Sequence, residues 1–145
     1  MKIVLQRVSR AAVSIDDAIV GSIGRGYVAL VGFGDGDDKS KIEKMVDKIS
    51  KLRIFSDENG KTNLSIADVC GGLLIVSQFT LYADCRKGNR PSFINAANPT
   101  LAEELYNYFI EYAKGKFDEV GHGVFGADMK VELVNDGPFT VILED

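Results

Sequence analysis

Three short polar segments carry the side chains with which this sequence could do chemistry. They are Ser77-Gln78-Phe79-Thr80-Leu81, Arg86-Lys87-Gly88-Asn89-Arg90-Pro91-Ser92-Phe93 and Asn135-Asp136-Gly137-Pro138-Phe139-Thr140. The first combines hydroxyl and amide groups, which can polarise a carbonyl group. The second places three cations within five residues, followed by an aromatic residue, a composition that suits a ligand with a phosphate and a base. The third is typical of a turn.

Several familiar kinds of catalytic site are excluded by the residues that the chain has. Its one histidine, His122, lies between two glycines with no serine motif around it, and there is no G-x-S-x-G sequence. A Ser-His-Asp triad is therefore not predicted. Cys70 and Cys85 have neither C-x-x-C nor metal-ligand spacing. We expect reduced cysteines, no metal site and no cofactor.

The apolar run Leu73–Tyr82 predicts a buried strand whose second half becomes polar. If the strand continues to Tyr82, its alternation places Ser77 and Phe79 on one face and Gln78 and Thr80 on the other. A structural role for these polar residues stays open, because serine or glutamine can simply hydrogen bond a neighbouring loop. The cations that follow could likewise form a solvated loop without a ligand.

The rest of the pattern predicts one domain over residues 1–145, of α/β (α+β) class, with a largely antiparallel sheet and two main helices. Strands are expected at 3–15, 18–23, 27–33, 73–82, 124–134 and 139–143, with turns at Asp16-Asp17, at Asn59-Gly60 and between the last two strands. Residues spaced by three and four predict the buried stripe of a first helix, at Ile42, Met45, Val46, Ile49 and Leu52. A second helix begins at 98–100 with a Thr100/Glu103 capping box and buries Leu101, Leu105, Tyr108, Phe109 and Tyr112.

Charge and composition limit the partners. The chain has 145 residues, 46% of them hydrophobic, and a formal net charge of −4. An acidic protein does not coat nucleic acid through its overall charge, so no DNA partner is expected, although a local basic patch could still hold an RNA end. We see no signal peptide and no apolar stretch of membrane-spanning length, and we therefore expect a cytoplasmic protein without a membrane partner.

Taken together, the motifs resemble those of the D-aminoacyl-tRNA deacylase family over essentially the whole chain. The resemblance rests on Gln6-Arg7-Val8, Leu52-Arg53-Ile54-Phe55, Ser77-Gln78-Phe79-Thr80-Leu81-Tyr82-Ala83-Asp84, Arg86-Lys87-Gly88, Arg90-Pro91-Ser92-Phe93, Phe125-Gly126-Ala127-Asp128-Met129 and Val131-Glu132-Leu133-Val134-Asn135-Asp136-Gly137-Pro138. Phe139 replaces a smaller aliphatic residue that we would expect after the Gly-Pro pair.

The resemblance implies a barrel-like homodimer that hydrolyses the ester of D-aminoacyl-tRNA at the subunit interface. A cis Gly137-Pro138 peptide of one subunit would face Ser77–Thr80 of the other, accept hydrogen bonds from the substrate's α-ammonium group and collide with an L side chain. Glycyl-tRNA would then be accepted to some degree.

The resemblance also assigns roles to residues. Ser77, Gln78, Phe79 and Thr80 are the catalytic candidates, through an oxyanion held by backbone N–H groups. Arg7 is expected to bind phosphate or adenine of the substrate, and the tRNA 3′ acceptor end is expected to contact Arg86, Lys87, Arg90 and Phe93. Water could be activated by Thr80 or by the tRNA's own 2′-hydroxyl. The alternatives are a non-catalytic RNA-binding dimer and a general small-ester hydrolase, for which we find no nucleophile with its base.

Overall fold

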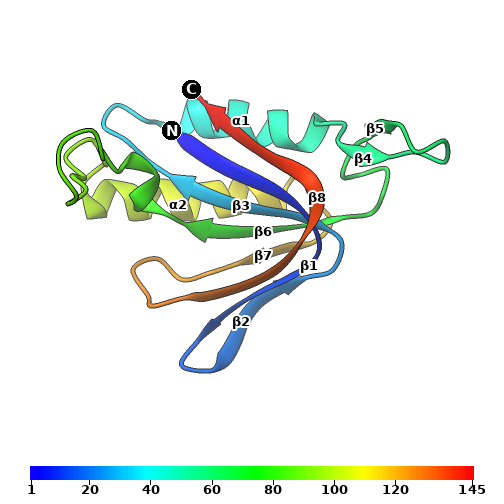
Figure 1. Ribbon diagram of the computed structural model, residues 1–145, viewed down its shortest axis with the longest axis horizontal. Helices are drawn as coiled ribbons and strands as arrows, with labels where there is room; N and C mark the ends of the chain where they lie inside the picture. The colour runs from blue at the N-terminus through cyan, green and yellow to red at the C-terminus, as the bar shows by residue number, and fades with distance from the viewer.

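One strongly curved sheet forms the body of the protein in the computed structural model, which describes residues 1–145 (Figure 1). Its strand order is β2-β1-β3-β6-β7, and β8 pairs with β1. These strands are β1 (Lys2–Ile15), β2 (Ala18–Ile23), β3 (Gly26–Gly32), β6 (Gly72–Ser77), β7 (Val120–His122) and β8 (Lys130–Glu144). A Cβ atom at Gly21 in β2 would lie 2.6 Å from the carbonyl oxygen of His122 in β7. This close approach brings the two ends of the sheet together into a nearly closed barrel.

The sheet is mixed. β1 runs antiparallel to β2, β3 and β8, whereas β3–β6 and β6–β7 are parallel pairs. Parallel neighbours require long crossover connections, and the helices α1 (Lys39–Lys51) and α2 (Pro99–Lys114) supply them. The small hairpin of β4 (Phe55–Ser56) and β5 (Thr62–Leu64) lies between α1 and β6. The expected antiparallel sheet is thus present around β1, and two parallel pairs complete it.

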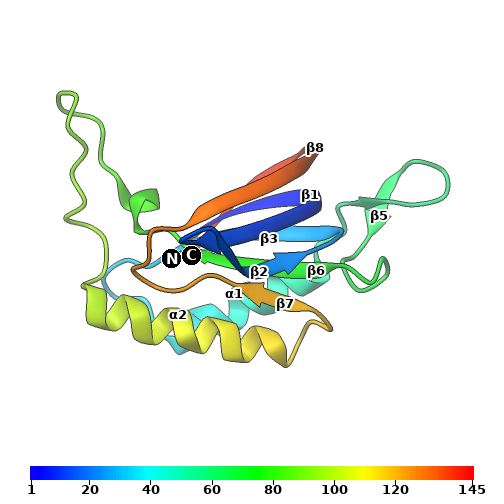
Figure 2. The same cartoon turned by 90° about the horizontal axis from the view of Figure 1, so that it is seen from below.

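Apolar side chains cover both faces of the central strands. Both helices pack on one face, and Figure 2 shows β8 on the side of the sheet away from them. Tyr27 and Leu73 belong to the large cluster under the helices, while their neighbours Val28 and Leu74 belong to a smaller cluster inside the curve of the sheet. Burial on both faces explains why β3 and β6 read as continuous apolar runs rather than as alternating ones. Neither helix meets the length and apolarity needed to span a membrane.

The first helix follows its prediction except at Leu52, which is its C-terminal cap and only partly buried, and the second departs further. Asp38 caps α1, and the buried stripe contains Ile42, Met45, Val46 and Ile49. In α2 the predicted capping box is wrong, because Asn98 is the cap and its side chain accepts the N–H of Leu101 at 3.1 Å. The buried residues of α2 are Ala102, Leu105, Tyr106, Phe109, Ile110 and Ala113. The hydroxyls of Tyr108 and Tyr112 donate instead to Glu43 and Asp47 of α1, so these rings bridge the two helices.

The predicted strand to Tyr82 ends early. β6 stops at Ser77, and residues Phe79–Tyr82 form the 3₁₀ helix η1. The Gln78 N–H still donates to the Val31 carbonyl at 2.7 Å, and the chain turns there. The alternation expected for residues 77–82 is therefore wrong beyond Ser77. Apolar residues in both elements hide this boundary from the sequence.

The predicted turn at Asn135–Pro138 is a bulge within one long strand, β8. Asn135 lies opposite Val8 and Thr140 lies opposite Gln6, so the intervening residues of β8 exceed those of β1 and loop out of the ladder. The Gly137-Pro138 peptide is cis, as the family resemblance implies. The strand predicted over 124–134 begins only at Lys130, and the short strand β7 was not predicted.

A buried carboxylate fixes the loop between β3 and α1. The Asp37 side chain is 3% exposed and accepts hydrogen bonds from the N-terminal ammonium group at 2.7 Å, the Gly34 N–H at 2.7 Å and Lys41 Nζ at 3.2 Å. Burial alone would raise the pKa of Asp37, but these three donors outweigh it and lower the pKa below its ordinary 3.8. The Tyr82 hydroxyl approaches the same carboxylate at 3.5 Å, which links the loop to η1.

We expect Asp37→Asn to cost about 3 kcal/mol of stability at pH 7, because it leaves the buried N-terminal ammonium group without its counter-ion. A lowered folded-state pKa gives stability that is fully present above the unfolded value of 3.8 and is lost as the pH falls through the folded value. The difference from wild type should therefore shrink in acid. Urea unfolding at pH 7 and at acid pH measures this, with Asp35→Asn in the same loop as control. An equal deficit at both pH values would contradict the assignment.

Candidate active site

A hollow of about 310 Å³ lies where β6 ends. Ser77, Gln78 and Phe79 form one wall, and the loop residues 126–129 form the other. The first backbone hydrogen bond of η1 runs from the Leu81 N–H to the Gln78 carbonyl. The N–H groups of Phe79 and Thr80 precede it and have no acceptor within the helix. Donors suited to a developing oxyanion therefore stand beside the hollow.

A second hollow of about 300 Å³ shares Ser77, Phe79 and Gly126 with the first. Its other lining residues are Ala97, Pro99, Ala102 and Phe125, so it is almost entirely apolar. Gly126 has φ +75°, a left-handed conformation that favours glycine, and no atom lies within 4 Å of the position of a Cβ. The turn at Gly126 thus lets one loop line both hollows without a side chain filling them.

Tyr106 supports this end of the sheet from below. Its buried hydroxyl lies 2.9 Å from the Ile75 carbonyl of β6 and 3.2 Å from the Gly123 carbonyl. Burial raises the pKa of Tyr106, so the hydroxyl keeps its proton and remains a donor. One side chain of α2 therefore joins the strand that ends at Ser77 to the loop that follows β7.

Thr80 has no general base beside it. Its hydroxyl accepts a hydrogen bond from the Gln78 side-chain amide, which cannot take up a proton. Thr80 lines neither of the two hollows. Ser77, Gln78 and Phe79 are thus brought together at a hollow, whereas the hydroxyl of Thr80 faces an amide.

The basic loop follows η1 directly. Asp84 and Ser92 close it through two backbone hydrogen bonds of 2.8 and 3.0 Å. Phe93 packs its ring edge-on against Phe79, with centroids 5.1 Å apart, and Phe79 is 56% exposed. The predicted tRNA-binding segment is therefore in contact with the predicted catalytic segment.

Arg7 is placed differently from what the sequence led us to expect. The residue is 5% exposed and lies beneath the bulge of β8. Its guanidinium group donates to the carbonyl oxygens of Ile54, Asp136 and Gly137 at 2.6, 3.1 and 3.2 Å, and Nε lies 3.0 Å from the Asp136 carboxylate. A contact of Arg7 with phosphate or adenine stays a prediction. Its observed contacts make it the support of the Gly137-Pro138 bulge.

Within this chain the two predicted halves of the site lie level with opposite ends of β6. Ser77, at the end of β6, lies level with Ile3 through β3. The bulge begins at Asn135 opposite Val8, which lies level with Gly72 at the start of β6. Five residues of strand separate the two levels, a span of about 16 Å. Figure 1 shows the bend of β8 at the end where β6 begins.

Residues 126–129 were missing from the predicted site. The sequence Phe125-Gly126-Ala127-Asp128-Met129 was part of the family resemblance, but no chemistry attaches to these residue types alone. Only the fold brings this loop across from Ser77. The available signal was the pair Gly126-Ala127 within that motif.

The comparisons with known proteins agree across the full chain. The family model described as D-Tyr-tRNA(Tyr) deacylase matches residues 4–144. A D-aminoacyl-tRNA deacylase of Lactobacillus acidophilus is 54% identical over 144 residues, with 99% of each chain covered. One of Clostridioides difficile is 53% identical, with 99% of this chain and 97% of the relative covered.

Solved structures share the fold. A structure described as c-Myc DNA Unwinding Element Binding Protein is 42% identical with a TM-score of 0.94, and the match covers 100% of this chain and 99% of that one. A probable eukaryotic D-amino acid tRNA deacylase, 18% identical, has a TM-score of 0.85 over 98% and 97% of the chains and shows the common fold alone. The match along the whole sequence confirms the resemblance and means that this chain belongs to the D-Tyr-tRNA(Tyr) deacylase family.

Proposed function

We propose that the protein is a homodimer that hydrolyses the ester bond of D-aminoacyl-tRNA and rejects L-aminoacyl-tRNA. The observation that carries this proposal is the separation of Ser77–Thr80 from Gly137-Pro138 within one protomer. A second copy can bring its own bulge to the hollow beside Ser77, and two-fold symmetry then forms two equal sites. Family membership supports the reaction, and a tRNA substrate implies that the protein works in the cytoplasm.

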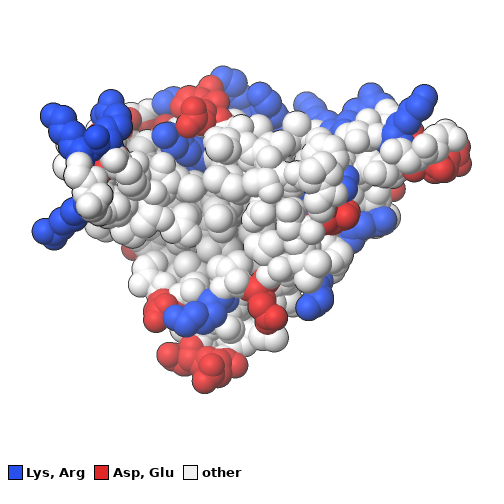
Figure 3. All heavy atoms as spheres, viewed as in Figure 1, with Lys and Arg blue, Asp and Glu red and all other residues white.

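The outer surface of β8 supports the dimer. β8 pairs with β1 along one edge and with no strand along its other edge. Val131, Val134 and Ile142 are exposed apolar residues on this strand. Figure 3 shows a broad area without charged side chains across the middle of the face on which β8 lies outermost. An open strand edge with apolar side chains is a ready surface for a second protomer.

The bulge is suited to reading handedness. Gly137 is exposed, and no atom of its own protomer lies within 4 Å of the position of a Cβ, so its backbone can approach a ligand closely. A carbonyl oxygen accepts two hydrogen bonds, so the Gly137 carbonyl can serve the substrate's α-ammonium group as well as Arg7. With the ammonium group held, an L side chain meets the bulge and a D side chain points away from it. Glycine meets nothing, and glycyl-tRNA is expected to be cut as well.

Hydrolysis would take place in the hollow beside Ser77. Water attacks the ester carbonyl, and the N–H groups of Phe79 and Thr80, with Ser77 or Gln78, stabilise the negative charge on its oxygen. The neighbouring apolar hollow, with Phe79 and Phe125, fits the terminal adenine. Because no basic side chain contacts Thr80, the tRNA 2′-hydroxyl is the better candidate for assisting the attacking water.

Thr80→Ala is expected to retain kcat within about ten-fold of wild type, since the removed hydroxyl has no base to activate it. Loss of a covalent nucleophile would instead cost on the order of 10⁴-fold or more. Single-turnover hydrolysis of D-tyrosyl-tRNA measures the difference, with Thr80→Ser as the variant that keeps the hydroxyl. An inactive alanine variant beside an active serine variant would establish covalent catalysis.

The decisive experiment compares D-tyrosyl-tRNA with L-tyrosyl-tRNA in the presence of a metal chelator. We expect rapid loss of the D ester while the L ester persists. Equal loss of both esters would remove the chiral role of Gly137-Pro138.

The second candidate is a non-catalytic nucleic-acid-binding dimer on the same scaffold. The observation that favours it is the printed description of the 42% identical structure as a DNA-element binding protein. Binding of tRNA without hydrolysis of either tyrosyl ester would select this candidate over the deacylase.

A further inference from the structure

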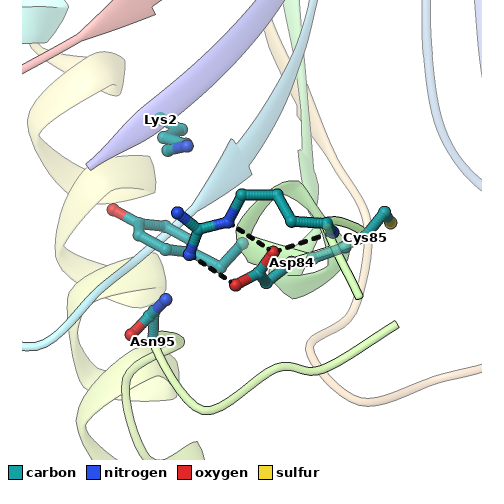
Figure 4. A pocket seen from close by; sticks show the side chains of 7 residues that line it. Lys2, Asp84, Cys85 and Asn95 are labelled. Atoms are coloured by element: carbon teal, nitrogen blue, oxygen red, sulfur yellow. Dashed lines mark hydrogen bonds and ion pairs between the residues drawn. The ribbon is translucent and has the colours of Figure 1, made fainter. Parts of the chain in front are cut away.

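Two surface hollows next to η1 share one ion pair, and Figure 4 shows this pair among the residues that line the first hollow. Both are lined by Asp84 and Arg86. The first, of about 560 Å³, is completed by Lys2, Tyr82, Ala83, Cys85 and Asn95. The second, of about 570 Å³, is completed by Lys87, Arg90, Ser92 and Ile94. The ion pair is therefore shared by a hollow of mixed charge and a basic hollow, which together form the depression beside η1.

Arg86 forms an ion pair with Asp84. Its backbone N–H, Nε and one terminal nitrogen donate to the Asp84 carboxylate at 3.0, 2.9 and 2.6 Å. These hydrogen bonds hold the pKa of Asp84 well below its usual range, so the pair stays ionised near neutral pH. Asp84 also closes the loop through its backbone bridge to Ser92. The carboxylate thus neutralises one of the three cations and fixes the base of the loop.

Lys87 and Arg90 have no such partner. Neither side chain forms an ion pair within the protomer, and both line the basic hollow. Figure 3 shows Lys and Arg side chains gathered at the end of the molecule where this loop lies in Figure 1. Two free cations in one hollow of a protein with net charge −4 form a local anion site.

The loop that lines the basic hollow contacts the catalytic segment. Ile94 lines it, and the adjacent residue Phe93 packs on Phe79. With the terminal adenosine beside Phe79, the chain of an RNA substrate would leave across this loop. The phosphates that link the terminal adenosine to the preceding nucleotides would then pass the free cations.

We propose that Lys87 and Arg90 bind phosphodiester groups of the single-stranded 3′ end of tRNA, immediately before the terminal adenosine. Asp84 acts as a positioning residue, because it holds Arg86 aside and keeps the loop open. This inference rests on the proposed deacylase function and divides the three cations of the loop into two that bind and one that is held.

The test uses three D-tyrosyl esters: of adenosine, of the trinucleotide CCA and of full-length tRNA. The double variant Lys87→Gln/Arg90→Gln is compared with Lys48→Gln/Lys61→Gln, which removes the same charge from side chains outside the depression. We expect KM to rise about ten-fold for the trinucleotide and the tRNA, with unchanged kinetics for the adenosine ester. The slope of log(kcat/KM) against log[salt] should become shallower by about 1.4 for two phosphate contacts on a single strand.

The outcomes separate the two ideas. If wild type cuts the three esters but the loop variant behaves like its control, the phosphate assignment is overturned and the deacylase function stands. A defect confined to full-length tRNA would overturn it too, by placing the contact on the duplex stem. If wild type cuts none of the esters, the proposed function itself fails.

The positioning role of Asp84 has its own readout. Asp84→Asn releases Arg86 as a third free cation, so the salt dependence with full-length tRNA should become steeper by about 0.7. Asp84→Glu, which keeps the carboxylate, should restore the wild-type slope. An unchanged slope in Asp84→Asn would contradict this role.

Discussion

Gly137→Ala is expected to lower kcat/KM for D-tyrosyl-tRNA by about 100-fold, a loss typical of misplacing a substrate by about 1 Å. The folded protomer should remain as stable as wild type, because a Cβ at this position meets no atom within 4 Å and the residue has no positive φ. A methyl group that disturbs nothing in its own protomer can impair catalysis by facing the substrate or the hollow of the second protomer that receives the bulge. Thermal unfolding and single-turnover hydrolysis, measured on the same preparation, check both halves of the prediction.

Mixing two inactive variants provides the control. Gly137→Ala damages the bulge, and Ser77→Trp would fill the hollows that receive it. In the proposed dimer, a mixed pair would have one site in which both damaged halves meet and one in which both halves are intact. Random exchange of protomers should therefore restore about one quarter of the wild-type activity. No recovery after exchange, with both variants folded, would mean that each site is formed within one protomer.

The second large effect is expected at Arg7. Arg7→Met leaves the carbonyl oxygens of Ile54, Asp136 and Gly137 without their donor, which should cost about 3 kcal/mol of stability. The bulge then loses its support, and hydrolysis of D-tyrosyl-tRNA should fall by about 100-fold. Denaturant unfolding measures the first effect, and single-turnover kinetics measures the second.

Two variants make the Arg7 result specific. Arg10→Met removes an exposed cation from the same strand and should change neither quantity appreciably. Arg7→Lys keeps the charge but not the fork of donors, so it should rescue only part of the stability. If Arg7→Met were fully stable and raised only KM for tRNA, direct contact with the substrate, as the sequence first suggested, would be the correct interpretation.

The helices and the central strands were predictable because each shows one clear apolar pattern. Apolar residues lie three or four apart in the helices and form continuous runs in the strands that are buried on both faces. The spacing of Ile42, Met45 and Ile49 fixed the buried face of α1. Two boundaries were predicted wrongly, the end of β6 and the turn that is in fact a bulge in β8, and both errors have a common cause. At Ser77 and at Asn135–Pro138, local composition does not report whether pairing with a distant strand continues. The Gln78 N–H donates to the Val31 carbonyl, and residues on both sides of Pro138 pair with β1. These partners lie far away in the sequence.

The candidate site residues could be named from the sequence, but their contacts could not. Ser77, Gln78 and Phe79 were named together as candidates, and they line one hollow. Arg7 was expected to bind phosphate or adenine of the substrate, and only the fold reveals the three carbonyl oxygens to which its buried guanidinium group donates. The loop at 126–129 could not be placed, since small residues gain a role only from what the fold sets opposite them.

The pairing of β1 with β8 also bears on how quickly the chain can fold. Lys2 lies opposite Glu144 and Ser14 opposite Lys130, so this ladder joins residues more than 100 positions apart. Closing such a long loop must precede any gain from the pairing, which slows folding. Until residues 130–144 are available, one edge of β1 stays open along nearly its whole length. During synthesis this edge of β1 therefore stays without its partner until β8 has been made, and pairing of the two strands is a late step in folding.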